Sequence, residues 1–266
     1  MIIAGYTASL CIGVSLGLIG GGGSILTVPV LVYLFKINPV LATSYSLFIV
    51  GSTSLAGAIN NYFKNLVHIK TALLFGIFSI TTVFLTRKFI IPHIPENIFS
   101  IGNFKVTHSL LTMILFGLLM IMAAIAMIRN ENARQEIQEN KTGKTNFSGL
   151  AFYAVSVGLA TGILGAGGGF LLIPTLVLFM HLPMKEAVGT SLFIIALNSL
   201  IGFTGDIGHF DINWIFLLKI TAIAIAGIFI GGVLSKKIDG KKLKKAFGWF
   251  VLIMGIYILI NELLFR

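Results

Sequence analysis

The sequence has few charged residues and a single cysteine. Only 11% of its 266 residues are charged, whereas a soluble domain carries about 25%. A chain this poor in charge cannot cover a water-soluble surface, so a soluble fold is excluded. The one cysteine, Cys11, lies in an apolar run, and an internal disulfide is excluded as well. Residues 1–20 lack the basic start of a signal peptide, and we expect them to form the first membrane segment.

Apolar residues dominate what remains. They make up 56% of the chain, and the mean hydropathy is +0.99. Several apolar runs approach the roughly 20 residues that a helix needs to cross a bilayer. The composition therefore predicts an all-α, polytopic membrane protein. The net charge of +10 is then best explained by Lys and Arg in loops that orient the helices, and nucleic acid is not an expected partner.

The apolar sequence divides into ten segments, which form two halves around a polar stretch. This stretch, from Arg129 to Asn146, predicts a linker over 129–147. We expect a single transport domain, with a first membrane repeat over 1–128 and a second over 148–266. The predicted segments are 2–19, 24–36, 40–60, 66–86 and 107–128 in the first half, and 148–164, 170–182, 186–204, 212–235 and 246–264 in the second.

The two halves resemble each other. A shift of 145 positions aligns Gly17–Gly57 with Gly162–Gly202 without a gap, and 16 of the 41 positions are then identical. The identities include glycines, a proline and the run "SLFI", which shared apolar composition does not readily explain. The sequence therefore predicts an internal duplication.

The topology depends on how many segments cross the membrane. Six lysines between Ser235 and Phe247 predict that this loop is cytoplasmic. If all ten segments cross, the repeats are inverted, the linker is also cytoplasmic, and both termini lie outside. If each glycine-linked pair makes one crossing, there are eight crossings and parallel repeats. We favour inverted repeats, although Arg87, Lys88 and Lys105 argue against the external loop 86–105 that they require.

Two glycine runs interrupt the most apolar parts of the chain: "GLIGGGGSILTVPVL" (17–31) and "GILGAGGGFLLIPTL" (162–176). Each is followed by a segment of about 13 residues, which as a helix covers roughly 20 Å and cannot span a bilayer. Broken backbone inside a membrane must be buried in protein or line a polar cavity. The N-terminus of each half-helix would offer N–H groups and a partial positive charge to an anion. Paired interruptions at matching positions are typical of a transporter binding site.

Close helix packing is the alternative role for glycine in a membrane segment. Three pairs have the four-residue spacing that suits it: Gly13/Gly17, Gly158/Gly162 and Gly227/Gly231.

These motifs resemble the sulfite exporter TauE/SafE family of membrane permeases. The matching stretches are "GLIGGGGSILTVPVL" with "ATSYSLFIVGSTSLAGAINNY", and "GLATGILGAGGGFLLIPTLVL" with "AVGTSLFIIALNSLIGF". The resemblance implies transport of sulfite, sulfonates or related organic anions across a prokaryotic plasma membrane. One departure is Ala166, which stands where the first run has Gly21.

Small polar residues begin the third segment of each half, as "ATSYS" (42–46) and "AVGTS" (187–191). Their hydroxyls could donate hydrogen bonds to an anion, or could bond to their own helix. Asn198 is the strongest candidate, because an amide in mid-membrane is costly unless it is bonded. We expect the substrate site to contain Gly20, Gly21, Gly22, Gly23, Ser24, Ser44, Tyr45, Ser46, Thr53, Gly165, Gly167, Gly168, Gly169, Thr190, Ser191 and Asn198.

Three ionisable residues could carry a coupling ion or compensate the charge of an anion. Lys219 lies within an apolar run, where an ionisable residue is a functional candidate, although its side chain could instead reach an interface. Asp206 and His209 follow a segment end and could carry a proton, or could belong to a solvated loop. The wider cluster of Asp206, His209 and Asp211 favours the loop.

The sequence therefore predicts a secondary transporter for small anions, driven by a proton or sodium gradient. No metal-site spacing of His, Cys and Glu is present, and "TGKT" (142–145) lacks the first glycine and the strand of a nucleotide-binding loop. We expect no cofactor, no metal and no enzymatic activity. An anion channel, or an intramembrane enzyme or sensor without transport, is the alternative.

Overall fold

The computed structural model describes residues 2–101, 104–129, 147–165, 167–178, 180, 182–235 and 240–264. Within these residues, five helices are long and apolar enough to cross a membrane, and four shorter apolar helices accompany them. This confirms the all-α, polytopic membrane fold. The predicted linker falls almost wholly on 130–146, outside the described residues.

The helices lie close to the predicted segments in both halves. In the first half they are α1 (Ile2–Ile19), a 3₁₀ turn (Gly21–Leu26), α2 (Thr27–Pro29), a π turn (Val30–Leu34), α3 (Pro39–Tyr62), α4 (Ile69–Leu85) and α5 (His108–Arg129). In the second half they are α7 (Phe147–Leu164), α8 (Gly169–Leu178), α9 (Met184–Asp206), α10 (Trp214–Leu234) and α11 (Gly240–Leu264).

Local signals set several helix starts. Asn38 precedes α3, and its side-chain oxygen accepts a hydrogen bond from the Val40 N–H at 2.9 Å, while Pro39 occupies the first helical position. Asn213 caps α10 in the same way, accepting from the Phe216 N–H at 3.1 Å. Each asparagine satisfies an N–H that the first turn of a helix leaves unpaired.

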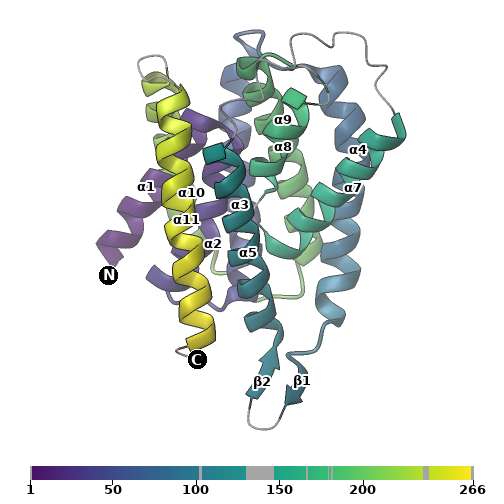
Figure 1. Cartoon of the computed structure of the whole chain (residues 1–266), viewed down its shortest axis with the longest axis vertical. Coiled ribbons are helices and arrows are strands. Elements are labelled where there is room, and N and C mark those ends of the chain that lie inside the picture. The colour runs from purple at the N-terminus through teal and green to yellow at the C-terminus, as the bar shows by residue number, and fades with distance from the viewer. Residues whose placement is uncertain are drawn as a thin grey trace.

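The loop expected at 86–105 is more ordered than the sequence predicted. After α4 the chain continues through a π turn (Thr86–Ile90) and a 3₁₀ turn (Ile91–His93). It then forms an antiparallel hairpin of β1 (Asn97–Ile101) and β2 (Phe104–Thr107), which extends beyond one end of the helices (Figure 1). Arg87 lies in the π turn, and its side chain is fully buried.

Glycines bring two helix pairs into close contact, one on each side of the molecule (Figure 1). On one side, α1 packs against α10, where Gly13 lies against the carbonyl of Ala224 and Gly227 against that of Leu10. On the other, α7 packs against α4, where Gly158 lies against the carbonyl of Ser79. These contacts leave no room for a side chain. The packing role considered for the glycine pairs is therefore confirmed at these positions.

Helices α3 and α9 pack against each other in opposite directions. Gly51, in the middle of α3, contacts Leu200 of α9, and Gly57, nearer the end of α3, contacts Leu192. Moving along α3 toward its C-terminus, the contacts on α9 move toward the N-terminus of α9. The two helices are therefore antiparallel. The shift of 145 aligns these two helices, so their packing is what inverted repeats require, while the duplication itself stays a prediction.

Candidate functional site

The two glycine runs meet inside the molecule, main chain against main chain. A methyl group on Gly21 would overlap the backbone of Gly169, and one on Gly169 would overlap the backbone of Gly21. Each run interrupts its helix with left-handed backbone: Gly20 has φ of 73°, and Gly165, Gly167 and Gly168 have φ of 66°, 67° and 65°. Other residues rarely adopt this conformation. The prediction of interrupted helices at both places is thus confirmed.

Each run turns the chain back along the helix before it. In the first half, Gly23 lies against Ser15 and Leu16, and the ring of Phe35 lies against Gly5, so residues 21–35 retrace α1. Gly22 lies in the 3₁₀ turn that starts this return. The segment is therefore one arm of a helical hairpin with the glycines at its turn.

Each run also contacts the first turns of the third segment of the opposite half. Gly20 faces Val188 and Ser191 at the start of α9, and Gly165 lies against the main chain of Thr43 at the start of α3. Thr43 and Val188 are related by the shift of 145, so the two contacts correspond. In this conformation, however, Gly21 occupies the position in front of the N-terminus of α8, where we expected an anion.

Four of the predicted hydroxyl ligands have hydrogen bonds within the chain. The Tyr45 hydroxyl accepts from the Asn213 N–H at 2.7 Å, and the Thr190 hydroxyl accepts from the His68 N–H at 2.9 Å. These two bonds also correspond under the shift, and both tie a third segment to the start of a fourth. Ser24 and Ser191 donate to carbonyls of their own turns, those of Gly21 and Val188.

The remaining polar candidates are buried on α3 and α9, and carry side-chain atoms for which the described chain supplies no hydrogen-bond partner. Asn198 donates to the Ser79 hydroxyl at 2.7 Å, but its side-chain oxygen has no partner. Ser199, which lies beside Gly167 and aligns with Ser54, also has a buried side-chain oxygen without a partner. The hydroxyls in this state are those of Ser46, Thr53, Ser54 and Ser199.

A buried ion pair lies beside the second glycine run. The Arg87 Nη1 donates to Asp206 Oδ2 at 3.2 Å and to the Thr43 hydroxyl at 3.1 Å, with the arginine side chain fully buried and the aspartate 1% exposed. The expectation that Asp206 belongs to a solvated loop is therefore wrong, since α9 includes it and Arg87 neutralises it. Sequence reasoning missed Arg87 because it treated residues 86–105 as a loop.

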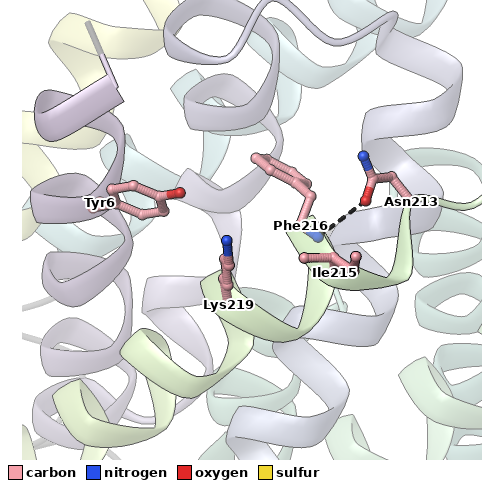
Figure 2. A pocket seen from close by; sticks show the side chains of 5 residues that line it. All are labelled: Tyr6, Asn213, Ile215, Phe216 and Lys219. Carbon is pink, nitrogen blue, oxygen red and sulfur yellow. Dashed lines mark hydrogen bonds between the residues drawn. The ribbon is translucent and has the colours of Figure 1, made fainter.

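The other two ionisable candidates are exposed. His209 lies in the turn between α9 and α10, as the solvated-loop alternative expected. Lys219 lies in the second turn of α10 and lines an open cavity of about 260 Å³ with Tyr6, Asn213, Ile215 and Phe216. Figure 2 shows its ammonium group directed into the space between Tyr6 and Phe216. This cavity is separate from the glycine runs, whose neighbours in space are other residues.

The comparison with protein families decides the identity. The model of the family described as "Sulfite exporter TauE/SafE" matches residues 6–258. The chain belongs to the TauE/SafE family. The match covers both glycine runs, α3, α9 and the Arg87–Asp206 pair, so the whole candidate site lies within the TauE/SafE region.

Curated relatives agree with this assignment. A "Probable membrane transporter protein" of Xylella fastidiosa strain Temecula1 is 30% identical over 251 residues, covering 93% of this chain and 91% of the relative. "Probable membrane transporter protein YdhB" of Bacillus subtilis is 24% identical over 248 residues, covering 93% and 96%. No solved structure matches the chain. TauE/SafE membership and these relatives identify a multi-pass membrane transporter.

Proposed function

We propose that this TauE/SafE protein is a secondary transporter that moves small anions, such as sulfite, sulfonates or related carboxylates, across a prokaryotic plasma membrane. The family description supports the chemical class of the substrate. The relatives support transport, because their names describe membrane transporters. Buried hydrogen-bond donors at the site support a negative charge on the solute.

The observation that carries this proposal is the set of buried polar atoms on α3 and α9, the two helices that contact the glycine runs. In a membrane protein, a buried polar group without a partner is costly, and such groups are typical of substrate pathways. Here hydroxyls on the antiparallel helices α3 and α9, and the Arg87 guanidinium beside them, are buried with atoms that have no partner among the described residues. Hydroxyl and guanidinium groups donate hydrogen bonds, and donors are what an anion needs.

The contact between the glycine runs favours a carrier over a channel. Gly21 and Gly169 touch through their main chains, which leaves no open path between them in this conformation. A carrier must close its pathway on at least one side at every stage of its cycle, and we expect the hairpin tips to separate when the solute passes. A proton or sodium gradient is the expected driving force.

Reconstitution in liposomes tests this function. The purified protein is assayed for uptake of radiolabelled sulfite, methanesulfonate and acetate, with and without a pH gradient and a sodium gradient. We expect saturable uptake of at least one anion, accelerated by one of the gradients. Flux at channel rates would replace the carrier by an anion channel. The absence of flux for every anion, in protein that is folded in detergent, would contradict the proposal.

A further inference from the structure

Arg87 is a fully buried cation that the described chain only partly satisfies. An arginine side chain has five N–H donors. Those on Nη1 reach Thr43 and Asp206, whereas Nε and Nη2 have no partner among the described residues. A guanidinium offers two parallel N–H groups to one oxyanion along an edge. Nε and Nη2 form such an edge, and here it is buried and unpaired.

The surroundings of this edge suit an oxyanion. Thr43 contacts both Arg87, through its hydroxyl, and Gly165, through its main chain, so only one residue separates the guanidinium from the second glycine run. Thr86, whose hydroxyl is also buried and unpaired, lies against Gly162 at the end of α7. The chain therefore places a buried, unpaired hydroxyl and a cation beside the same glycine-rich turn.

Asp206 holds the guanidinium in place from the opposite edge. Its Oδ2 is bonded to Arg87, and the Ser44 hydroxyl also interacts with its carboxylate. Gly205, the preceding residue, lies against the Cβ of Arg87 and admits this close approach. The carboxylate therefore orients Arg87 and offsets its charge while no anion is bound. Its negative charge also weakens the attraction of a second anion.

The corresponding place at the first glycine run carries no charge. The shift of 145 relates Arg87 to Gly232, and Asp206 to Asn61. The Asn61 amide donates to the carbonyl of Gly57 in its own helix at 2.9 Å. Thr43 corresponds to Val188, which contacts Gly20 but has no hydroxyl. The two glycine runs therefore differ in their charged neighbours, although each of them interrupts a helix with a similar backbone.

We propose that Arg87 is the charged ligand of the transported anion, which it binds through Nε and Nη2 at the second glycine run alone, with Asp206 as a positioning residue. The ligand class is a small oxyanion that presents two oxygens to the guanidinium: sulfite, a sulfonate or a carboxylate. This inference rests on the proposed function, and it adds that the two halves contribute unequally to binding.

The decisive variant is Arg87→Lys, which keeps the positive charge and removes the guanidinium edge. The matched control is Lys88→Gln, which removes a cation from the adjacent, exposed position. Binding of unlabelled sulfite, methanesulfonate and acetate is measured by calorimetry in detergent, together with uptake in liposomes. We expect Arg87→Lys to weaken binding about tenfold or more, and Lys88→Gln to leave it unchanged.

Two further variants keep the test valid if Arg87→Lys folds poorly. Arg87→Gln with Asp206→Asn removes both buried charges together, so that no unpaired ion remains in the interior. We expect this double variant to fold, with a sharp melting transition, and to lose binding. Asp206→Asn alone removes the competing negative charge and should tighten anion binding, while the loss of orientation slows turnover.

The outcomes separate this inference from the proposed function. If the wild-type protein neither binds nor transports any of the three anions, the proposed function fails. If the wild type binds and transports an anion, and a folded Arg87→Lys or double variant does so with the same affinity, Arg87 is not the ligand and the inference is overturned. Weakening by Lys88→Gln equal to that by Arg87→Lys would also overturn it, since the effect would then not be specific to the guanidinium of Arg87.

Discussion

Gly21 and Gly169 touch through their main chains, although they belong to different halves of the chain. Neither position has room for a Cβ atom, so the contact depends on glycine at both. The tips of two helical hairpins meet there, beside the antiparallel helices α3 and α9. In a transporter, this contact is where the pathway would close.

A single methyl group at this contact should be disruptive. We expect Gly21→Ala and Gly169→Ala each to lower the free energy of unfolding by about 1–3 kcal/mol and to reduce uptake, because the tips can no longer close. Thermal denaturation in detergent and liposome uptake measure the two effects. The matched control is Gly76→Ala in α4, where a Cβ would meet only Ile80, at 3.4 Å. Equal behaviour of Gly21→Ala and Gly76→Ala would show that the contact is unimportant.

Tyr45 and Thr190 provide a second test, because their bonds suggest a structural role for two predicted ligands. Each hydroxyl accepts a hydrogen bond from the N–H just before α10 or α4. We expect Tyr45→Phe and Thr190→Val each to cost about 0.5–1.5 kcal/mol of stability and to leave KM for the anion unchanged. A raised KM without a change in melting temperature would instead place these hydroxyls on the substrate.

The hydropathy runs predicted the helices well, and the reason is physical. A helix in a membrane must be apolar over its length, so its ends are marked where polar residues begin. The order of α3, a polar turn and α4 follows directly from that requirement. The glycine runs were equally informative, because a break inside an apolar region needs left-handed main chain, which glycine adopts most readily.

The position of Arg87 did not follow from hydropathy, because a cation after an apolar run normally marks a helix end. A signal was nevertheless present. No helix-stopping residue occurs between α4 and Pro92, so the helical backbone continues past Arg87. The hairpin of β1 and β2 also had a signal in the Gly102-Asn103 dipeptide between two apolar runs. The ion pair with Asp206 could not be predicted, since it depends on how α4 and α9 pack.

Substitution of Ser54 or Ser199 should change stability and anion binding in opposite directions. They correspond under the shift of 145, and both hydroxyls are buried without a partner in the described chain. If these hydroxyls bind the solute, replacing them should increase the stability of the protein and reduce its function. We expect Ser54→Ala and Ser199→Ala each to raise the free energy of unfolding by about 1 kcal/mol and to lower the affinity for the anion.

The control for these variants is Ser9→Ala on α1. Ser9 is also buried, but its hydroxyl donates to the Gly5 carbonyl at 2.8 Å. We expect this replacement to gain no stability and to leave the affinity unchanged. Ser54→Ala and Ser199→Ala variants that bind as well as the wild type would remove these two hydroxyls from the site.

The antiparallel packing of α3 and α9 makes a prediction about topology. Lys64 follows the end of α3, and Asp211 follows the end of α9, so the two exposed residues lie at opposite ends of the helix pair. Helix α10 runs parallel to α3, since Tyr45 bonds Asn213 near their starts and Gly57 contacts Ile228 near their ends. The end of α10 therefore lies on the side of Lys64, as does the lysine-rich start of α11 that follows it, and the positive-inside rule places that side in the cytoplasm.

Labelling with a membrane-impermeant thiol reagent measures this arrangement. In a Cys11→Ser background, we expect Asp211→Cys to react in intact cells and Lys64→Cys to react only after the membrane is opened. The opposite pattern would reverse the orientation and put the lysines outside, against the rule. Reaction of both cysteines in intact cells would be incompatible with helices that cross the membrane between these two residues, and with inverted repeats built on α3 and α9.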